Sequence, residues 1–578
     1  MAIDRGADGY FHPRSAAEVA ELLATTGDVP VRVCGARMSH PPAIHGDGFL
    51  GAGAPPPGLV EVVLDRLADV EWVEERPDSA VLWVGAGCLL GPAYDDATGE
   101  SWKTSLTFQL QQKGYALDQM SGVSHQALGG FLMTGSAGGS VRHALHDDVL
   151  GLELVDGTGR VRLLERDSAD AEARELFFAA GVSMGLLGVL TRVKLKVGRT
   201  FNVVGAEDTT PFEGTAFDLE GPGRGGKPTL AEYFTDEDYA RILWWPQHRF
   251  DRVQLWHARR QAPSPGFVRQ PFEVLSRFEA LFGSYIYTVL GNLEDMDALP
   301  GKLKGWYAEL ERALDPSASK NSPCAPPDHP PGGVARLREA VQQAVGLGVS
   351  RDAGSLTRWL YRQAVRGLSP VLNELWDGRS GALIAAALRR ALPQSIGKLL
   401  GLFIRDGSRP FADSWMCGLP MDNGMSPTLW HTEFTELWVP LEDGARAVQL
   451  LHDYFTHSDA AEAYRRTGAY AVELYPGPPS DFWLSPGYGT ACLRINVFWF
   501  AASAGSPRDA LYPPLWERLR ALGLRLHWGK HLPDASDTWR AHYRQAHPKL
   551  ERFLSLRAAL DPRQRFVTRY WREQLGID

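Results

Sequence analysis

Residues 128–140 (LGGFLMTGSAGGS) hold five glycines in thirteen positions, and this density constrains the fold more than any other feature of the chain. Glycine allows positive φ and a close approach to another backbone or to a ligand, because it has no Cβ. A second loop, residues 35–40 (GARMSH), follows a predicted strand at 29–34. Neither loop reads GxGxxG after a strand or GxxxxGK[ST], which disfavours a Rossmann site and a P-loop. Both can still place backbone N–H groups against a pyrophosphate.

The first two hundred residues alternate predicted strands and helices. Helical spacing predicts a helix at 15–24, with Ser15 as its N-cap and Glu18 three residues on. The sequence between two strands, Asp156-Gly157-Thr158-Gly159, is typical of a hairpin. Strands are predicted at residues 29–34, 59–64, 80–84, 150–154, 161–164 and 189–197, and later at 252–256 and 493–500. A Pro-rich segment at 321–333 predicts an exposed loop.

The composition narrows the class of protein. At about 150 residues per domain, the 578 residues predict two to four domains. The formal net charge of -9 argues against a nucleic-acid partner, because such proteins usually carry a basic face. The N-terminus lacks the apolar run of a secretory signal, and no stretch reaches the ~18 apolar residues of a membrane span. We therefore expect a cytoplasmic globular protein.

The cysteines agree with that location. They are scattered, odd in number and without a CxxC pair, so they fit neither a disulfide framework nor a zinc site, and no metal is expected. The five are Cys34, Cys88, Cys324, Cys417 and Cys492.

Residues 351–405 are predicted to form amphipathic helices with nine Lys and Arg against three Asp and Glu. In an acidic protein this excess indicates possible peripheral contact with a membrane surface. A solvated basic face on cap helices, or an oligomer contact, explains the same pattern.

Five motifs follow one another within residues 8–197. They are G-x-x-x-S at 35–39, V-G-A-G at 84–87, L-G-G-x-x-x-T-G-x-x-G-G at 128–139, the D-G-T-G hairpin, and G-L-L-G-V-L-T-R-V at 185–193. In this order they resemble the FAD domain of the vanillyl-alcohol oxidase/p-cresol methylhydroxylase superfamily. The resemblance implies an α+β fold in which a PCMH-type FAD-binding domain of two α/β subdomains occupies residues 1–197. A large α+β cap with an antiparallel sheet would occupy 198–529, with a helical insertion at about 334–405, and residues 530–578 would return to the FAD domain.

Later segments narrow the resemblance. Trp244-Trp245-Pro246 with DRVQLW at 251–256, HWGK at 527–530, and Asp561-Pro562 with Phe566 are similar to aldonolactone and alditol oxidases. The long middle region is similar to flavin-linked type II cholesterol oxidase, whose cap also begins with an aromatic-Pro segment.

The resemblance implies which residues hold FAD. They are Gly35, Ala36, Arg37, Met38, Ser39, His40, Gly129, Gly130, Thr134, Gly135, Ser136, Gly138, Gly139, Ser140, Gly188 and Val189.

Met38 departs from the family pattern. Many relatives carry there a His that is covalently bonded to the flavin, and a thioether cannot replace it. His40 lies two residues on, where a shifted loop would present it to the flavin, but a structural hydrogen bond is the favoured explanation of a lone His. No Cys lies in residues 119–140 to make a second link. We expect non-covalent FAD, which favours an electron acceptor other than O₂.

This chain retains part of the catalytic residue set of the family that it resembles. Glu473 and Tyr475 lie where relatives have Glu-x-Arg on a cap strand, and residues i and i+2 share one face. Asn496 matches an active-site Asn of the sterol-type enzymes, and Lys530 a Lys beside the flavin N1/C2=O edge. Each has a structural alternative: a pair with a cap Arg for Glu473, a packed ring for Tyr475, and a backbone contact for Asn496.

The resemblance implies an FAD-dependent oxidoreductase that removes hydride from a CH–OH carbon of an alcohol, lactol or lactone and passes it to flavin N5. Glu473 would take the hydroxyl proton, with Tyr475 or His527 as alternatives. The Arg-to-Tyr change and the aromatic-rich cap favour a lipophilic or secondary-metabolite substrate. Electrons would pass to O₂ or another acceptor. The alternative functions are an FAD-binding isomerase or cyclase without net oxidation, and a non-catalytic binding module.

Overall fold

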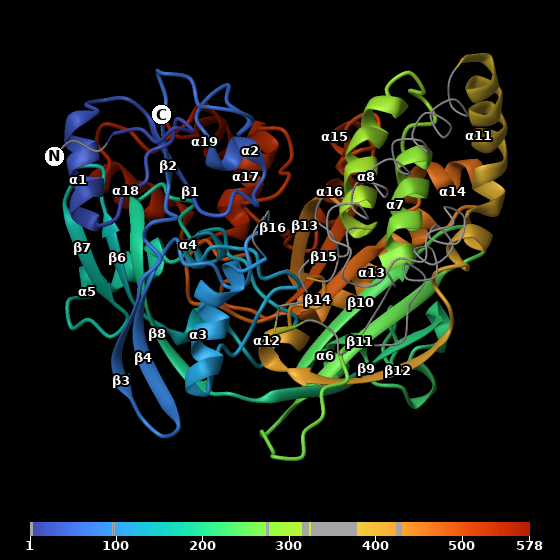
Figure 1. Ribbon diagram of the computed structural model, residues 1–578, viewed down its shortest axis with the longest axis horizontal. Coiled ribbons are helices and arrows are strands. Elements are labelled where there is room, and N and C mark those ends of the chain that lie inside the picture. Colours follow the sequence, from blue (N-terminus) through green and yellow to red (C-terminus); the bar gives the residue numbers. More distant parts are fainter. Residues whose placement is uncertain are drawn as a thin grey trace, which may run out of the picture.

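The computed structural model describes residues 4–94, 96, 99–272, 277–314, 323–324, 378–423 and 430–578. Two bodies lie side by side, and both chain ends belong to the same one (Figure 1). The chain has a mixed α+β fold with antiparallel sheets, as predicted.

The first body contains a small parallel pair and an antiparallel sheet. The parallel strands are β1 (Val31–Cys34) and β2 (Val60–Val63). In spatial order the sheet consists of β3 (Val70–Glu75), β4 (Ser79–Gly85), β8 (Val189–Arg199), β6 (Val149–Val155) and β7 (Val161–Glu165), with β5 (Tyr115–Ala116) paired to β8. Its helices are α1 (Ala16–Thr25), α2 (Pro41–Ile44), α3 (Leu106–Lys113), α4 (Leu128–Met133), α5 (Ala171–Ala180), α17 (Asp537–Ala546), α18 (Leu550–Leu560) and α19 (Arg569–Leu575).

Several local predictions for this body are confirmed. Ser15 Oγ accepts the Glu18 N–H at 3.2 Å and caps α1, although the Glu18 carboxylate accepts the Arg14 N–H instead of closing a capping box. Strands β6 and β7 form the predicted hairpin, with Val155 opposite Val161. Local turn and cap chemistry therefore determines these elements.

The second body is built on an eight-stranded antiparallel sheet. Its spatial order is β12 (Gly407–Ser414), β9 (Asn202–Pro211), β11 (Arg252–Gln261), β10 (Tyr239–Trp245), β14 (Val472–Gly477), β15 (Cys492–Phe500), β13 (Thr432–Pro440) and β16 (Arg525–Leu526). Strands β10 and β14 are buried on both faces, so they lack the polar alternation that marks a half-exposed strand.

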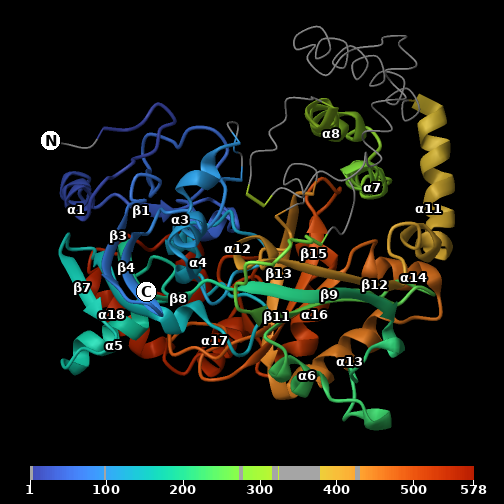
Figure 2. The same cartoon turned by 60° about the horizontal axis from the view of Figure 1, so that its bottom comes forward.

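Different helices cover the two faces of this sheet (Figure 2). On one face Trp244 packs against Phe455 of α13, with ring centroids 5.6 Å apart. On the other face Leu243 and Trp245 pack into a cluster with α7, α8 and α11. The first group of helices is α6 (Leu230–Asp236), α13 (Gly444–Phe455) and α16 (Pro513–Arg520); the second is α7 (Arg277–Leu290), α8 (Leu299–Leu314) and α11 (Gly378–Leu400). Shorter helices are α12 (Trp415–Gly418), α14 (Ala460–Thr467) and α15 (Pro507–Ala510).

Part of the predicted basic helical region lies outside the described residues, at 351–377. The remainder forms α11 and the turn after it, where Leu383 and Leu402 are exposed. Contact with a membrane surface stays a prediction. Among the described residues, no helix is long and apolar enough to cross a membrane.

The prediction from the cysteines is wrong for one pair. Cys324 and Cys417 form a disulfide, although 93 residues separate them in sequence. Their scattered spacing gave no hint of the pairing, because folding and not local sequence brings α12 to Cys324. The cysteine pattern therefore no longer argues for a reducing compartment. Cys34, Cys88 and Cys492 are free and buried.

Candidate functional site

A cavity lies between the loop at 35–39, helix α4 and the turn at 527–530. The predicted FAD residues that line it are Gly35, Ala36, Arg37, Met38, Ser39, Gly129, Gly130, Thr134, Ser136 and Gly188. His527 and Lys530, predicted as catalytic residues, line the same cavity. Motifs separated by almost five hundred residues therefore meet at one site.

The loop at 35–39 has the chemistry of an anion cradle. Within the described part of the chain, the backbone N–H groups of residues 36–39 donate to no protein acceptor. Arg37 has a φ of 57°, which turns the loop back on itself. Successive N–H groups in such a turn form a concave anion site. A Cβ on Gly130 would meet no atom within 4 Å, so this glycine borders open space in the cavity. These features fit the pyrophosphate of FAD.

The other predicted FAD residues do not line this cavity: His40, Gly135, Gly138, Gly139, Ser140 and Val189. A Cβ on Gly138 would lie 2.0 Å from the Met120 carbonyl oxygen, and one on Gly139 would lie 2.3 Å from that of Ala240. Glycine is therefore needed at position 138 for packing within the first body and at position 139 for contact between the two bodies.

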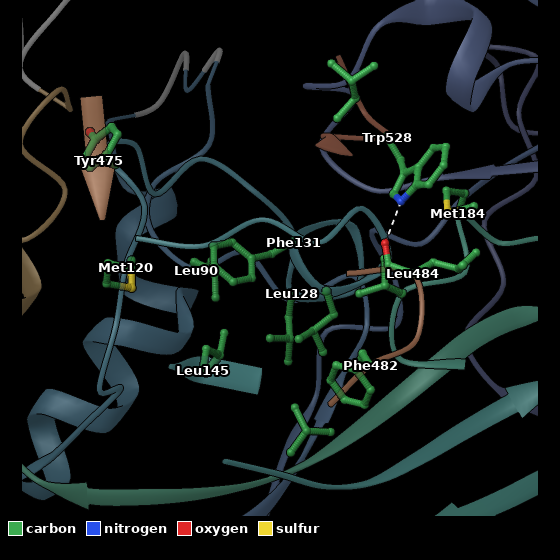
Figure 3. Close-up of a cluster of buried hydrophobic side chains, with 14 of the residues drawn as sticks. Leu90, Met120, Leu128, Phe131, Leu145, Met184, Tyr475, Phe482, Leu484 and Trp528 are labelled. Carbon is green, nitrogen blue, oxygen red and sulfur yellow. Dashed lines mark hydrogen bonds between the residues drawn. The ribbon is translucent and has the colours of Figure 1, made fainter. Parts of the chain in front are cut away.

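A cluster of buried hydrophobic side chains adjoins the cavity through Trp528 and Met184 (Figure 3). Trp528 and Met184 both line it, and Trp528 Nε1 donates to the Leu484 carbonyl at 2.7 Å. Tyr475 and Met120 lie at the opposite end of the same hydrophobic cluster.

Met38 lines the cavity, whereas His40 packs on His531, with ring centroids 4.1 Å apart. The His40 N–H donates to the Gly529 carbonyl at 2.7 Å. Burial, reinforced by the electrostatic effect of the neighbouring His531, lowers the pKa of His40 to about 3. His40 is held as a neutral structural ring.

His527 is held at both ring nitrogens. Its Nδ1 accepts the Gly529 N–H at 3.1 Å, so the neutral ring carries its proton on Nε2, which lies 2.9 Å from Ser136 Oγ. Burial lowers the pKa of His527 to about 4. With neither nitrogen open to a substrate, His527 is a positioning group and a poor candidate for the base.

Lys530 brings positive charge to the cavity. Burial lowers its pKa to about 8, and the negative charge of Glu436 partly opposes that change. The Lys530 ammonium lies 4.0 Å from the centroid of the Phe434 ring, a cation–π contact that holds it in place.

Glu473 and Asn496 form a buried pair across β14 and β15, where they are direct cross-strand partners. Asn496 Nδ2 donates to Glu473 Oε2 at 2.7 Å. Glu473 Oε1 and Asn496 Oδ1 have no hydrogen-bond partner among the described residues. Arg241 Nη1 lies 3.6 Å from Oε1 and forms a shorter bond, 2.6 Å, to Asp422. Buried polar atoms without partners are uncommon, so these two oxygens are candidates for contact with a ligand.

The surroundings of Glu473 tune its acidity. Burial raises its pKa to about 7, and the negative charge of Asp422 adds to the effect. Arg241 and the hydrogen bond from Asn496 oppose it. A carboxyl group with a pKa near neutrality is suited to accept and release a proton.

Tyr475 has a different role from the one predicted. Its ring is buried between the loop at 137–139 and the Arg494 guanidinium, which lies 4.5 Å from the ring centroid. Burial, with the negative charges of Glu473 and Asp422, raises the pKa of Tyr475 well above its ordinary value. The neutral phenol is therefore a poor base.

Four charged residues escaped prediction from the sequence: Arg241, Asp422, Glu436 and Arg494. Arg494 is the cross-strand partner of Tyr475, and its Nε lies 3.2 Å from Glu436 Oε1. Burial opposes ionisation of Glu436, but Arg494 leads the cations that hold its pKa below the ordinary value. Arg494 lies two residues before Asn496 on the same strand face, which is the one signal that could have revealed it.

The fold and cavity agree with the class of protein predicted from the motifs, the vanillyl-alcohol oxidase/p-cresol methylhydroxylase superfamily, for which FAD is the implied cofactor. A variant of cholesterol oxidase from Brevibacterium sterolicum shares the fold, with a TM-score of 0.59 and 12% identity. That match covers 98% of this chain and 94% of the other.

Within this class, residues 427–574 match the family model ALO, D-arabinono-1,4-lactone oxidase. D-arabinono-1,4-lactone oxidase of Saccharomyces cerevisiae is 26% identical over 259 residues, which are 43% of this chain and 41% of that enzyme. L-gulonolactone oxidase of Mus musculus is 25% identical over 240 residues, 41% of this chain and 45% of that enzyme. The chain thus matches less than half the length of these curated relatives, and the resemblance predicted from the sequence is confirmed.

Substitutions of Gly139 and Gly130 should have different effects, because Gly139 is packed against the cap and Gly130 borders open space in the cavity. Gly139→Ala should lower the thermal unfolding midpoint, because its Cβ would collide with the Ala240 carbonyl and overpacking costs about 1–3 kcal/mol. Gly130→Ala, the matched control, should leave the midpoint of the apoprotein unchanged and weaken FAD retention. Circular dichroism and FAD titration measure the two effects. An unchanged midpoint for Gly139→Ala would contradict the assigned contact.

Proposed function

We propose that this protein is an FAD-dependent oxidase that oxidises the CH–OH group of a lactone, with O₂ as electron acceptor. The observation that carries the proposal is the buried Glu473–Asn496 pair, which has two unpartnered oxygens. Asn496 is in turn the cross-strand partner of Glu436, whose charge interacts with Lys530. The segment that matches the D-arabinono-1,4-lactone oxidase family, residues 427–574, contains all three residues.

Residues 1–197 with 530–578 are proposed to form the PCMH-type FAD-binding domain, and residues 198–529 the cap. The N–H groups of residues 36–39 would hold the pyrophosphate, and the open space beside Gly130 would admit the cofactor. Bound FAD would supply the acceptor for the hydride that leaves the substrate carbon.

The protein residues manage the proton. As the C–H bond releases its electron pair with the hydrogen, the substrate O–H bond breaks and a carbonyl forms. Glu473 Oε1 receives the hydroxyl proton, while Asn496 Nδ2 keeps Oε2 occupied. Asn496 Oδ1 accepts a hydrogen bond from a second hydroxyl of the substrate. This division of roles leaves one oxygen of the carboxylate for the reaction.

Cations beside the cavity stabilise negative charge that develops there during the reaction. Lys530 lines the cavity. Arg494 forms an ion pair with Glu436, and both cations lower the pKa of Glu436. Fixed charges in a dry site stabilise a developing negative charge without reorganising. Relatives have an Arg where this chain has Tyr475, and the loss of that Arg is one argument for an isomerase without net oxidation. Arg494, the cross-strand partner of Tyr475, supplies a guanidinium group beside that position and weakens this argument.

The polarity of the site favours a hydroxyl-bearing lactone over a lipophilic alcohol. An apolar ligand would leave Glu473 Oε1 and Asn496 Oδ1 desolvated and unpaired, at a cost of about 1–3 kcal/mol each. Substrate hydroxyl groups supply the donors that both oxygens lack.

The flavin is proposed to be non-covalent, because the thioether of Met38 lines the cavity and His40 is held against His531. Acid precipitation should therefore release the yellow colour into the supernatant. Colour retained in the pellet would show a covalent link and contradict this assignment.

Anaerobic reduction tests the function. D-arabinono-1,4-lactone or L-gulono-1,4-lactone should bleach the flavin absorbance, and air should restore it with formation of hydrogen peroxide.

Lys530→Met should slow bleaching by about 10²-fold, because it removes a fixed cation at the reacting centre. Lys549→Met is the matched control: Lys549 also lies over an aromatic ring, Trp483, but away from the cavity. If no lactone or alcohol bleaches the flavin, the proposed function is wrong.

The rate of flavin reduction should follow a bell-shaped pH profile. It should rise as the pH passes about 7 and Glu473 loses its proton, and fall above about 8 as Lys530 loses its charge. Asp422→Asn removes a negative charge that raises the pKa of Glu473, so the acidic limb should move to lower pH. Single-turnover reduction between pH 5 and pH 10 measures both limbs. The exposed Asp481 provides the control, Asp481→Asn, and an acidic limb that survives in Glu473→Gln would contradict the role of Glu473.

A further inference from the structure

A second cavity, of about 470 Å³, lies where the end of the cap sheet meets α16 and α17. Strands β13, β15 and β16 contribute to its lining together with these two helices, and no residue that lines it also lines the cofactor cavity. Its volume is within the usual range for a small-molecule site. Glu473, Asn496 and Lys530 do not line it, so the proposed chemistry gives this cavity no role.

One cross-strand row brings two arginines to the two sides of Trp438. Arg525 of β16 is the partner of Trp438 on β13, and both residues line the cavity. The next partner in the row is Arg494 of β15, whose guanidinium lies 5.4 Å from the centroid of the Trp438 ring. Arg494 has a carboxylate beside it, Glu436, at 3.2 Å. Arg525 forms no ion pair with any described residue, and its charged neighbours include no carboxylate.

The Arg525 guanidinium is held in place, but its charge is not neutralised. Its Nε donates to the Ala546 carbonyl at 2.8 Å, and its Nη1 donates to the carbonyls of Pro486 and Tyr488 at 3.2 and 2.7 Å. Within the part of the chain that the structure describes, Nη2 donates to no protein acceptor. Carbonyl groups carry no net charge, and burial lowers the pKa of Arg525. A cation withdrawn from water without a counter-charge is costly, so this position favours an anion.

The charge of the lining indicates a monoanion. Arg520 and Glu517, which also line the cavity, pair with each other at 3.0 Å and cancel. Burial lowers the pKa of His542, which keeps that ring neutral near pH 7. Arg525 therefore supplies the one positive charge that remains on the described lining. A guanidinium is suited to a planar carboxylate, and a single charge matches a carboxylate better than a phosphate dianion.

The remaining surface is largely apolar. Trp438, Pro440, Pro486 and Ala521 contribute hydrocarbon surface around Arg525. A compact ring or chain attached to the carboxylate would remove this surface from water, which adds to the free energy of binding.

We propose that this cavity binds a small organic carboxylate with a compact apolar body, its carboxylate on Arg525 and its body against Trp438 and the two prolines. The inference does not depend on the proposed function, because the two cavities share no lining residue. The bound carboxylate takes no part in hydride transfer.

Benzoate and its neutral isostere benzamide are the probes, each titrated calorimetrically into the FAD-loaded protein. Benzoate should bind saturably, with a dissociation constant of about 1 mM or tighter. Benzamide should bind at least about tenfold more weakly, because a hydrogen bond between charged groups contributes roughly that factor. Absence of saturable benzoate binding, or equal affinity for the two probes, would overturn the carboxylate site.

Two exposed residues of the lining, Gln545 and Glu517, locate the bound probe. Gln545→Glu adds a negative charge and should weaken benzoate binding by about threefold to fivefold, whereas Glu517→Gln removes one and should strengthen it by a similar factor. Neither change touches the hydrogen bonds of Arg525, whereas Arg525→Gln would also release three backbone carbonyls.

Glu462→Gln is the matched control, since Glu462 pairs with Arg465 three residues on, as Glu517 does with Arg520, but lies outside the cavity lining. Its affinity for benzoate should equal that of the unchanged protein. An affinity for benzoate that neither Gln545→Glu nor Glu517→Gln alters would show that the probe binds elsewhere, and would overturn the proposal. Bleaching of the flavin by a lactone is measured separately and decides only the proposed function.

Discussion

The contact between the loop at 137–139 and the cap sheet is the constraint on which the rest of the site depends. The Ala240 N–H donates to the Gly139 carbonyl at 2.8 Å, and Arg494 donates to the carbonyl of Ala137. Gly139 has no room for a Cβ on this side, because a Cβ would meet the Ala240 carbonyl and the Tyr475 ring. The approach brings β10, β14 and β15 against this loop, which directly follows Ser136 of the cavity lining, and it sets the position of Glu473 relative to that cavity.

Burial of charge is the second organising feature. Glu436 and Arg494 form an ion pair beside Lys530, and Arg241 links Asp422 to Glu473. Charges removed from water are costly unless they are paired, so each group restricts where its neighbours can lie. The two clusters have opposite effects on the pKa of their central carboxyl groups. Cations predominate near the cavity, where Glu436 stays ionised, whereas two carboxylates share Arg241 and the pKa of Glu473 rises toward neutrality. One sheet face thereby presents both a permanently ionised carboxylate, Glu436, and a carboxyl group that titrates near neutral pH, Glu473.

Sequence patterns anticipated much of the fold where local chemistry decides the structure. The capped helix α1 and the hairpin of β6 and β7 formed as predicted, because caps and tight turns require particular residues at particular positions. Strands β10 and β14 carried weak signals, since both of their faces are buried and apolar runs do not distinguish a strand from a buried helix. The disulfide between Cys324 and Cys417 carried none, because only the folded chain brings those cysteines together.

The sequence by itself determined the residue types of the site: glycines in two loops, Met38 in place of a linking His, and Glu473, Asn496 and Lys530 on recognisable segments. Tertiary structure decided what each does. It separated Gly130, which borders the cavity, from Gly139, which contacts the cap, and it held His527 and Tyr475 in positions that leave neither as a base. It also brought Arg241, Asp422 and Arg494 into the site from separate elements. The reason is that cross-strand register and burial set hydrogen bonds and pKa values, and both arise only when distant segments pack together.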